Sequence, residues 1–225
     1  MWHKRITLTL AVLAVLLLLI SGPGTRADLW PFRVGFGMFA GAMLLGLAAA
    51  GAAVVGLVLP HQRAHSVPLL VAALLLGAAS AAVPLDYVRR AKTLPYINDI
   101  STDTERLPQF SPPKLYESHF PEVQRRGYPN LHALALPLSP TQAFARAAEI
   151  AEGQGWEITA LDESKGTIEA VVTTRWFGFQ DDVVIRITRA GAGSRVDMRS
   201  KSRVGRSDVG TNAYRIEEFL ARMEH

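Results

Sequence analysis

Cysteine is absent from the 225 residues of this sequence. Its absence excludes disulfide bonds, thiolate metal sites and a cysteine nucleophile. A domain without cysteine needs no oxidative folding, so the redox state of its compartment stays open. The sequence also has no HExxH motif and no pair of histidines at metal-ligand spacing. We therefore expect neither a bound metal nor another cofactor.

Charge is nearly absent from the first part of the chain. The charged residues between positions 6 and 85 are Arg26, Asp28, Arg33 and Arg63. From Asp86 onwards charges recur every few residues, as in a water-soluble domain. The net charge of +4 and the hydrophobic content of 49% thus average over two different regions. The sequence predicts a transmembrane region at 1–91, a proline-rich connecting strap at 92–130 and an α+β domain at 131–225.

Three uncharged stretches in the first region are long enough to cross a bilayer. A helix needs roughly 20 apolar residues to span the hydrocarbon. Residues 6–25, 34–59 and 66–85 meet this length. A buried helix of that length in a soluble protein needs a large domain around it, and none is available here. The sequence therefore predicts three transmembrane helices, with the lipid bilayer as their partner.

The second stretch is rich in small residues. Gly37 and Gly41 form a GxxxG pair, a spacing that lets two helix backbones approach closely in lipid. We interpret this face mainly as packing against the other two spans. The alternative is a homo-oligomer formed through Gly37 and Gly41.

Basic residues near the spans bear on topology. Lys4 and Arg5 precede the first span, which predicts a cytoplasmic N-terminus and, after three crossings, an extracytoplasmic C-terminal domain. A cleaved signal peptide followed by a two-helix hairpin gives the same side. A count over the short loops disagrees, since the far side holds five basic residues against three. We give the first span priority and predict a multi-pass protein of the bacterial inner membrane with a periplasmic domain.

Dense proline marks the connecting strap. We expect extended and turn structure over 92–130 rather than regular helix, with the strap draped as an ordered segment over the domain. Asp99 and Asp103 lie within it, next to hydroxyl residues. Such residues most often form Asx turns, and a cation or substrate contact is the less favoured reading.

Regular patterns begin at Leu134. A short strand precedes a helix that opens at Ser139–Pro140, and four segments with period-2 alternation follow. A last amphipathic helix runs from about Asn212 to Met223. The order β-α-β-β-β-β-α predicts an antiparallel sheet with two helices on one face, similar to helix-grip domains.

Three segments resemble a known family. They are WFGFQDDVVIRI at 176–187, SRVDMRSKSRVGRSDVGTNAYRIEEF at 194–219 and YINDISTDTERLPQF at 96–110. Together they are similar to the domain-of-unknown-function 1499 family, and the stretch 28–33 resembles the start of the second span in its three-span bacterial members. The resemblance implies the domain but no activity. Other members carry a cysteine-containing segment, and any role of those cysteines does not transfer to this chain.

Polar residues of the last strands and the following loop form the candidate site. Glycines beside a helix N-terminus can present N–H groups to an anion, and neighbouring arginines reinforce this. The candidate ligand-binding residues are Asp181, Asp182, Arg199, Arg203, Arg206, Ser207, Asp208 and Asn212. For the loop we favour a tight turn in which Asp208 and Asn212 satisfy the backbone over an anion-binding turn. For Asp181 and Asp182, ordinary cross-strand ion pairs are the simplest reading, with the two side chains on opposite faces.

Two function classes follow. The first is a non-enzymatic envelope protein whose domain binds a partner protein, a lipid headgroup or a small anion. The alternative is a membrane-tethered hydrolase using Asp181, Asp182 or Asp208 with a strap histidine, His119 or His132. No nucleophile elbow surrounds Ser139 or Ser207, so we assign no catalytic residue. Nucleic acid is not expected as a partner, because the basic strands lack interleaved exposed aromatics.

Overall fold

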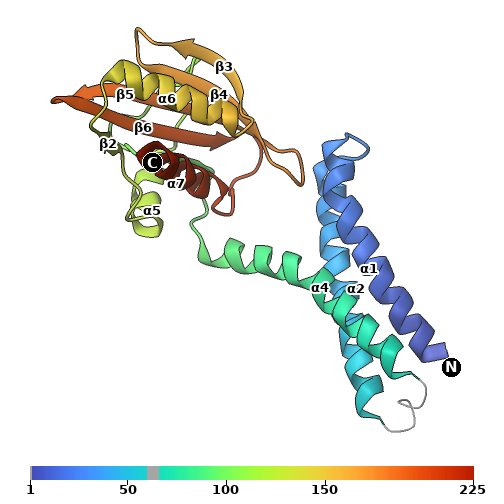
Figure 1. Cartoon of the computed structure of the whole chain (residues 1–225). Coiled ribbons are helices and arrows are strands. Elements are labelled where there is room, and N and C mark those ends of the chain that lie inside the picture. The colour runs from blue at the N-terminus through green and yellow to red at the C-terminus, as the bar shows by residue number, and fades with distance from the viewer. Residues whose placement is uncertain (1, 60–65) are drawn as a thin grey trace. The chain divides into compact units, whose positions relative to one another are not determined.

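The computed structural model describes residues 2–59 and 66–225, with side chains from Lys4 onward. Arg63, one of the basic residues counted for topology, lies outside the described residues. The chain forms two compact units, drawn in Figure 1. The first comprises Met1–Lys92 and Arg175–Gly178, and the second comprises Thr93–Thr174 and Phe179–His225. Each unit is described by itself below.

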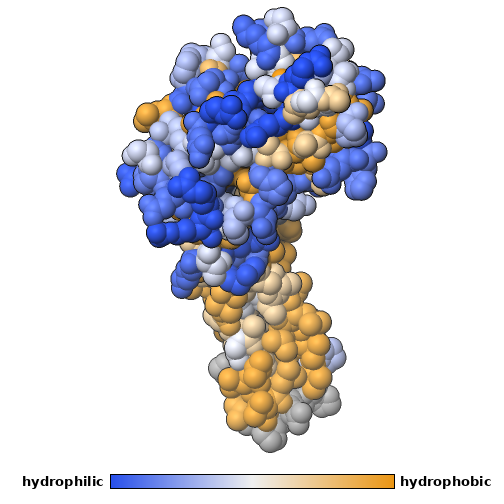
Figure 2. Space-filling model, turned by 90° about the vertical axis from the view of Figure 1, so that its left-hand side faces the viewer, coloured by the Kyte–Doolittle hydropathy of each residue, from blue (hydrophilic) through white to orange (hydrophobic). Residues whose placement is uncertain are grey.

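Three long helices build the first unit: α1 (Trp2–Arg26), α2 (Phe32–Val58) and α4 (Val67–Thr93). Each is long and apolar enough to cross a membrane, which confirms the three predicted spans. Figure 2 shows the apolar residues that cover the helix surface. Helix α4 continues beyond the predicted end at residue 85, because Asp86 pairs with Arg89 and Arg90 at i+3 and i+4 spacing and supports a polar last part.

Small residues let the helices of this unit approach closely. Ala11, Ala49, Ala53 and Ala73 form a buried cluster between the helices. Helix α2 approaches α4 closely at Gly46, where an added Cβ would lie 2.5 Å from Ser80 Oγ and 2.6 Å from the carbonyl oxygen of Gly77, and it approaches α1 closely at Gly35. A Cβ on Gly37, in contrast, would meet nothing within 4 Å. Close helix packing therefore depends on Gly35 and Gly46, which lie on either side of the predicted GxxxG pair.

A short loop segment also belongs to the first unit. The ring of Phe177 stacks on Phe36 with 4.8 Å between centroids, and Arg26 Nη1 donates a hydrogen bond to the carbonyl oxygen of Arg175. Aromatic and main-chain contacts thus hold Arg175–Gly178 against α1 and α2.

An antiparallel sheet forms the second unit, with strand order β1-β6-β5-β4-β3 and β2 also paired to β6. The strands are β1 (Asp99–Ser101), β2 (Leu134–Leu136), β3 (Glu157–Asp162), β4 (Thr167–Thr173), β5 (Gln180–Ala190) and β6 (Gly193–Ser202). The helices are α5 (Phe120–Gly127), α6 (Pro140–Gly153) and α7 (Thr211–Glu224). The predicted order from Leu134 to the last helix is confirmed, as is the α+β class. Strand β1 was not predicted.

Helices α6 and α7 cover one face of the sheet (Figure 1). The buried core between these layers includes Ile168, Ile185 and Met198 from the strands and Ile216 and Phe219 from α7. Helix α6 begins as predicted, with a capping box in which the Ser139 and Gln142 side chains each bond the other residue's backbone N–H. The hydrophobic effect of this layer is the main force that holds the domain together.

The strap covers the other face of the sheet. The sequence predicted two helices on one face of the sheet and a strap draped over the domain, without saying which face the strap covers. Residues 102–119 place Asp103, Phe110 and Lys114 over the charged side of β5 and β6. The expectation that proline excludes helix from the strap was wrong, because Pro121 stands in the first turn of α5, where its missing N–H costs nothing.

Candidate functional site

A fully buried ion pair lies at the centre of the strap-covered face. Arg199 donates from Nε and Nη2 to the two carboxylate oxygens of Asp99, at 2.9 and 2.8 Å, and both side chains are 0% exposed. The rings of Phe110 and Tyr116 lie 4.9 and 5.2 Å from the guanidinium carbon. Lys201 Nζ bonds the same carboxylate at 2.8 Å. Arg199 therefore has no surface on which to receive a ligand, and its role here is to join β6 to the strap.

Two further carboxylates bridge the same face. Arg186 and Arg195 each donate to Asp103 and to Asp197, at 2.9–3.3 Å. Burial acts to raise the pKa of Asp103. The backbone N–H groups of Arg106 and Glu105 and the two guanidinium charges outweigh this and lower that pKa. The predicted Asx turn is thus present at Asp103, and its carboxylate also ties the strap to β5 and β6.

Asp181 and Asp182 point to opposite faces, as alternation requires. Asp182 accepts from Arg203 at 2.9 and 3.1 Å and pairs with Lys114 of the strap. Burial acts to raise its pKa, but the hydrogen bonds and charges of Arg203 and Lys114 lower it overall. Asp181 instead pairs with Arg215 of α7 at 2.6 Å. The two carboxylates therefore share no proton, and each forms an ion pair in a different layer.

Asn212 organises the helix-covered side. It accepts from Ser200 Oγ at 2.6 Å and from Arg215 Nη1 at 2.5 Å, and it donates to Ser202 Oγ at 3.0 Å. Its second amide hydrogen bonds the carbonyl oxygen of Asn98 at 3.1 Å. All polar atoms of the Asn212 side chain are thus occupied in joining α7 to β6.

The loop between β6 and α7 is closed by its own carboxylate. Asp208 accepts from the backbone N–H groups of Gly210 and Asn212, both at 2.9 Å. Burial, the largest influence, raises the pKa of Asp208. These N–H groups are the ones that the anion-binding interpretation of the sequence assigned to an external anion. Because Asp208 occupies them, and Ser207 Oγ accepts from Val209 N at 3.3 Å, the tight-turn interpretation describes the geometry.

Arg203 and Arg206 are the exposed members of the predicted set. The Arg203 side chain is 41% exposed despite its bonds to Asp182. Arg206 makes no hydrogen bond or ion pair among the contacts described for this structure. Exposed large hydrophobic side chains accompany them: Tyr96, Leu115, Val204 and Tyr214. This group of six residues is called the basic–aromatic edge below.

Hydrogen bonds show why these six residues lie together. Asn98, two residues after Tyr96, donates from Nδ2 to the carbonyl oxygen of Gly205 at 2.6 Å. Lys201, near the end of β6, bonds the carbonyl oxygen of Leu115 at 2.9 Å. Tyr214 stands in the first turn of α7, directly after the loop. The basic–aromatic edge therefore surrounds the end of β6.

The two strap-region histidines are placed apart from the carboxylates. His119 lies 3.6 Å from Glu117 and against the Phe120 ring, and His132 is exposed. In the described part of the chain, no hydrogen bond or ion pair joins either histidine to Asp181, Asp182 or Asp208. The described residues also contain no group of three or more His, Asp or Glu side chains arranged to hold a metal. The described contacts thus do not join a strap histidine to any of the three candidate carboxylates.

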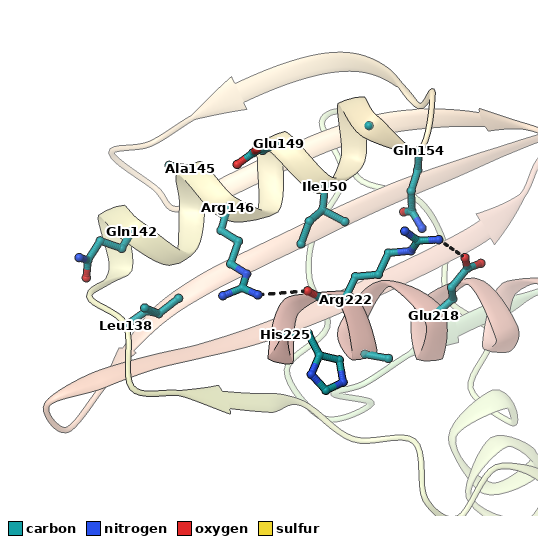
Figure 3. Close-up of a pocket in the computed structure, with 12 residues that line it drawn as sticks. Leu138, Gln142, Ala145, Arg146, Glu149, Ile150, Gln154, Glu218, Arg222 and His225 are labelled. Carbon is teal, nitrogen blue, oxygen red and sulfur yellow. Dashed lines mark hydrogen bonds and ion pairs between the residues drawn. The ribbon is translucent and has the colours of Figure 1, made fainter.

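A groove of about 1150 Å³ lies between α6 and α7, shown in Figure 3. Leu138, Ile150 and Ala221 supply apolar surface. Two of its charged residues, Arg222 and Glu218, pair at 2.9 Å, and Arg146 bonds the carbonyl oxygen of Arg222. Glu149 also lines the groove, and none of the predicted site residues does.

Fold and sequence together define a membrane protein with three helical spans and one α+β domain. The family model described as "Protein of unknown function (DUF1499)" matches residues 99–223, more than half of the chain. The chain belongs to this family. The match includes the strap from β1 onward, so the strap is part of the family's domain. A comparison with curated proteins gives no match.

Several residues that shape the site were not singled out from the sequence. Asn98 and Asp99 stood in a segment read as a turn, yet they bond the loop and the buried arginine. Lys114 was one charge among many in the strap. The charge pattern could have indicated such partners. Arginines that lie on a covered strand face need carboxylates to pair with, and another segment must supply them. The pattern could not say which segment supplies them.

Proposed function

We propose that this protein is a non-enzymatic envelope protein whose extracytoplasmic domain binds anionic lipid headgroups through the basic–aromatic edge. Arg203 and Arg206 supply the charge. Ser207, Asp208 and Asn212 shape the loop that carries them, and Asp181, Asp182 and Arg199 hold the strands below it. The observation that carries the proposal is the gathering of exposed aromatic and aliphatic side chains with two exposed arginines around one end of β6.

The chemistry of the edge fits a membrane surface. Tyrosine places an apolar body and a polar hydroxyl at the boundary between headgroups and hydrocarbon, and arginine pairs with phosphate. Each basic residue near an anionic surface contributes about 1 kcal/mol of attraction. Of the exposed large hydrophobic residues in the second unit, Leu161 alone lies away from this edge, on β3. The bias toward one edge favours a surface contact over chance exposure.

Chain length supports contact with the same bilayer. Only residues 94–98 separate the end of α4 from the start of β1. Five residues span at most about 17 Å when fully extended. Since Ile97 and Asn98 bond directly to the 203–210 loop, the edge is tethered close to where the chain leaves α4.

A headgroup explains the geometry better than a free small anion. A small-anion pocket needs convergent donors without internal partners. In this loop Asp208 already accepts from the N–H groups at the start of α7, and Arg199 is fully buried. What remains is a convex, mixed edge of charge and aromatic surface. Such an edge suits many weak contacts with a lipid surface rather than one built anion site.

Site-specific labelling tests this proposal, because the chain has no cysteine of its own. Val204→Cys carries a single environment-sensitive fluorophore on the full-length protein in nanodiscs. We expect quenching by headgroup-labelled lipid to rise when phosphatidylglycerol replaces part of the phosphatidylcholine. The matched probe is Leu161→Cys, equally exposed on β3, and its signal should not respond.

Charge variants complete the test. Arg206→Glu should weaken the phosphatidylglycerol-dependent quenching at position 204 about tenfold, in line with a reversal of one surface charge. Arg189→Glu makes the same charge change at the far end of β5 and should have no effect. Inorganic phosphate at millimolar concentration should not compete. Equal responses at positions 204 and 161, or competition by phosphate, would reject headgroup binding.

The other candidate functions have less support. The hydrolase alternative needs His119 or His132 beside Asp181, Asp182 or Asp208, and the described contacts do not bring them together. If the edge binds a partner protein instead, the quenching at position 204 should not respond to phosphatidylglycerol in this experiment. A homo-oligomer through Gly37 and Gly41 remains compatible with the open space beside Gly37.

A further inference from the structure

The loop that carries the two arginines has a strained backbone. Val209 adopts φ +53°, and it is a β-branched residue, for which positive φ is a genuine outlier. Gly205 and Gly210 beside it adopt φ +91° and +83°. A strained residue of this kind persists only where its surroundings determine it. The loop conformation is therefore imposed by neighbouring segments.

The segment that follows α4 imposes this conformation. Asn98 Nδ2 donates to the carbonyl oxygen of Gly205 at 2.6 Å, and Asp208 N donates to the carbonyl oxygen of Ile97 at 3.2 Å. The carbonyl oxygen of Asn98 accepts from Ser202 N at 2.8 Å and from the Asn212 side chain at 3.1 Å. Four hydrogen bonds thus join two residues of this segment to the loop and its two ends.

The closed loop also contains a half-buried carboxylate. Asp208 is held by two N–H groups, and the Val209 side chain beside it is only 8% exposed. Burial disfavours the charged form of Asp208, which is why its pKa is raised. Strain at Val209 and the half-buried charge at Asp208 both oppose the closed form. The bonds from Asn98 and Ile97 act in its favour.

In the closed conformation of the loop, one of the two arginines, Arg203, is hydrogen-bonded within the domain. Arg203 donates from Nε and Nη2 to Asp182 and from Nη1 to Gln180 Oε1 at 2.5 Å, while its backbone N bonds the carbonyl oxygen of Gln180 at 3.0 Å. Most of its donors are therefore used inside the domain. Release of the loop would let Arg203 leave Asp182, which keeps Lys114 as a partner.

We propose that loop 203–210 is a two-state latch, that Asn98 is the positioning residue that holds it closed, and that anionic headgroups favour the open state. This inference rests on the proposed headgroup contact and names its regulation. A ligand shifts a two-state equilibrium only through different affinity for the two states. Here the difference arises from Arg203, which can bind phosphate with its full set of donors only when the loop is open. Because Asn98 follows α4 closely, displacement of that segment would open the same latch.

Hydrogen exchange on the full-length protein in nanodiscs tests the latch. Asn98→Ala removes the bond to Gly205 and should speed exchange of the Asp208 and Gly210 amides about tenfold, with α6 unchanged. It should also increase quenching at position 204 by phosphatidylglycerol. The matched control is Gln109→Ala, which removes a comparable exposed bond, to the carbonyl oxygen of Leu107, and should alter neither signal.

A second variant leaves every hydrogen-bonding side chain in place. Gly205→Ala puts a Cβ at φ +91°, with its nearest neighbour at 3.5 Å, so it disfavours the closed loop by backbone strain alone. It should reproduce the Asn98→Ala result. Slower loop exchange on adding phosphatidylglycerol, or unchanged quenching in both variants, would overturn the latch while leaving headgroup binding intact. Absence of quenching in labelled Val204→Cys protein that carries neither loop substitution would instead remove the proposed function.

Discussion

At the scale of single residues, charges on both faces of the sheet are used to join layers. Asp181 pairs with α7, whereas Asp182 pairs with the strap, so neighbouring residues stabilise different parts of the domain. A buried charge without a partner is strongly destabilising, and each of these carboxylates therefore needs its cation. This explains why the basic strands do not form an open cationic surface.

Asp103 gives a pH prediction at this scale. Its folded-state pKa is lowered, so it contributes stability above its unfolded pKa near 3.9, and this contribution is lost as pH falls through the folded-state value. We expect Asp103→Asn to cost about 1–3 kcal/mol at pH 7 and much less near pH 2. Thermal unfolding in detergent, followed by near-ultraviolet circular dichroism, measures the difference.

The control for this prediction is Glu105→Gln, which removes one exposed carboxylate from the same turn. It should change stability by less than about 0.5 kcal/mol at either pH. If Asp103→Asn lost the same stability at both pH values, its ionised carboxylate would not be what holds the strap.

At the scale of elements, each segment is specified as much by its neighbour as by its own pattern. Strand β1 is three residues long and has no alternation of its own to reveal it, yet it pairs with β6 over Asp99–Ser101. Helix α2 has apolar residues on every side, so its sequence does not tell which glycine meets another helix. The strand at 99–101 and the contact glycine of α2 could therefore be identified only from the structure, which shows the neighbouring element.

The two kinds of glycine in α2 lead to a prediction. Gly46→Ala places a Cβ against the backbone of Gly77 and should destabilise the packing of α2 on α4 by about 1–3 kcal/mol. Gly37→Ala meets open space and should be neutral. The free energy of unfolding of the two variants is compared in detergent, by following the loss of the helical circular dichroism signal as a denaturing surfactant is added. An equal loss in both would show that the Gly37 face is also packed, for example in a homo-oligomer.

At the scale of the whole molecule, the protein combines a membrane anchor with a domain whose family has no assigned function. The domain has a polar layer, a sheet and a helix layer, and the chain reaches it directly from α4. A loop strained by about 1–3 kcal/mol at Val209 is bonded to that connection. The segment that directly follows the anchor is thus hydrogen-bonded to this loop, which is why we place regulation there.

Topology is the prediction that belongs to this scale. With Lys4 and Arg5 retained in the cytoplasm, three spans place His225 outside the cytoplasm. A reporter fused after His225 should then be active if it is of a kind that works in that compartment. Alkaline phosphatase fusions should therefore be active, and green fluorescent protein fusions exported in unfolded form should be dark. The reverse result would place the domain in the cytoplasm and remove the extracytoplasmic part of the proposal.

The sequence by itself determined the three spans, the order of strands and helices after Leu134 and the opposite directions of Asp181 and Asp182. Periodicity and hydropathy are local properties, so a single segment is enough to reveal them. Only the tertiary structure decided that the strap covers the second face, that Arg199 is buried against Asp99 and that Asn98 bonds the 203–210 loop. These contacts join residues far apart in the chain or depend on one backbone conformation among several. Their formation depends on which charges the packed layers remove from water, and no local pattern records that.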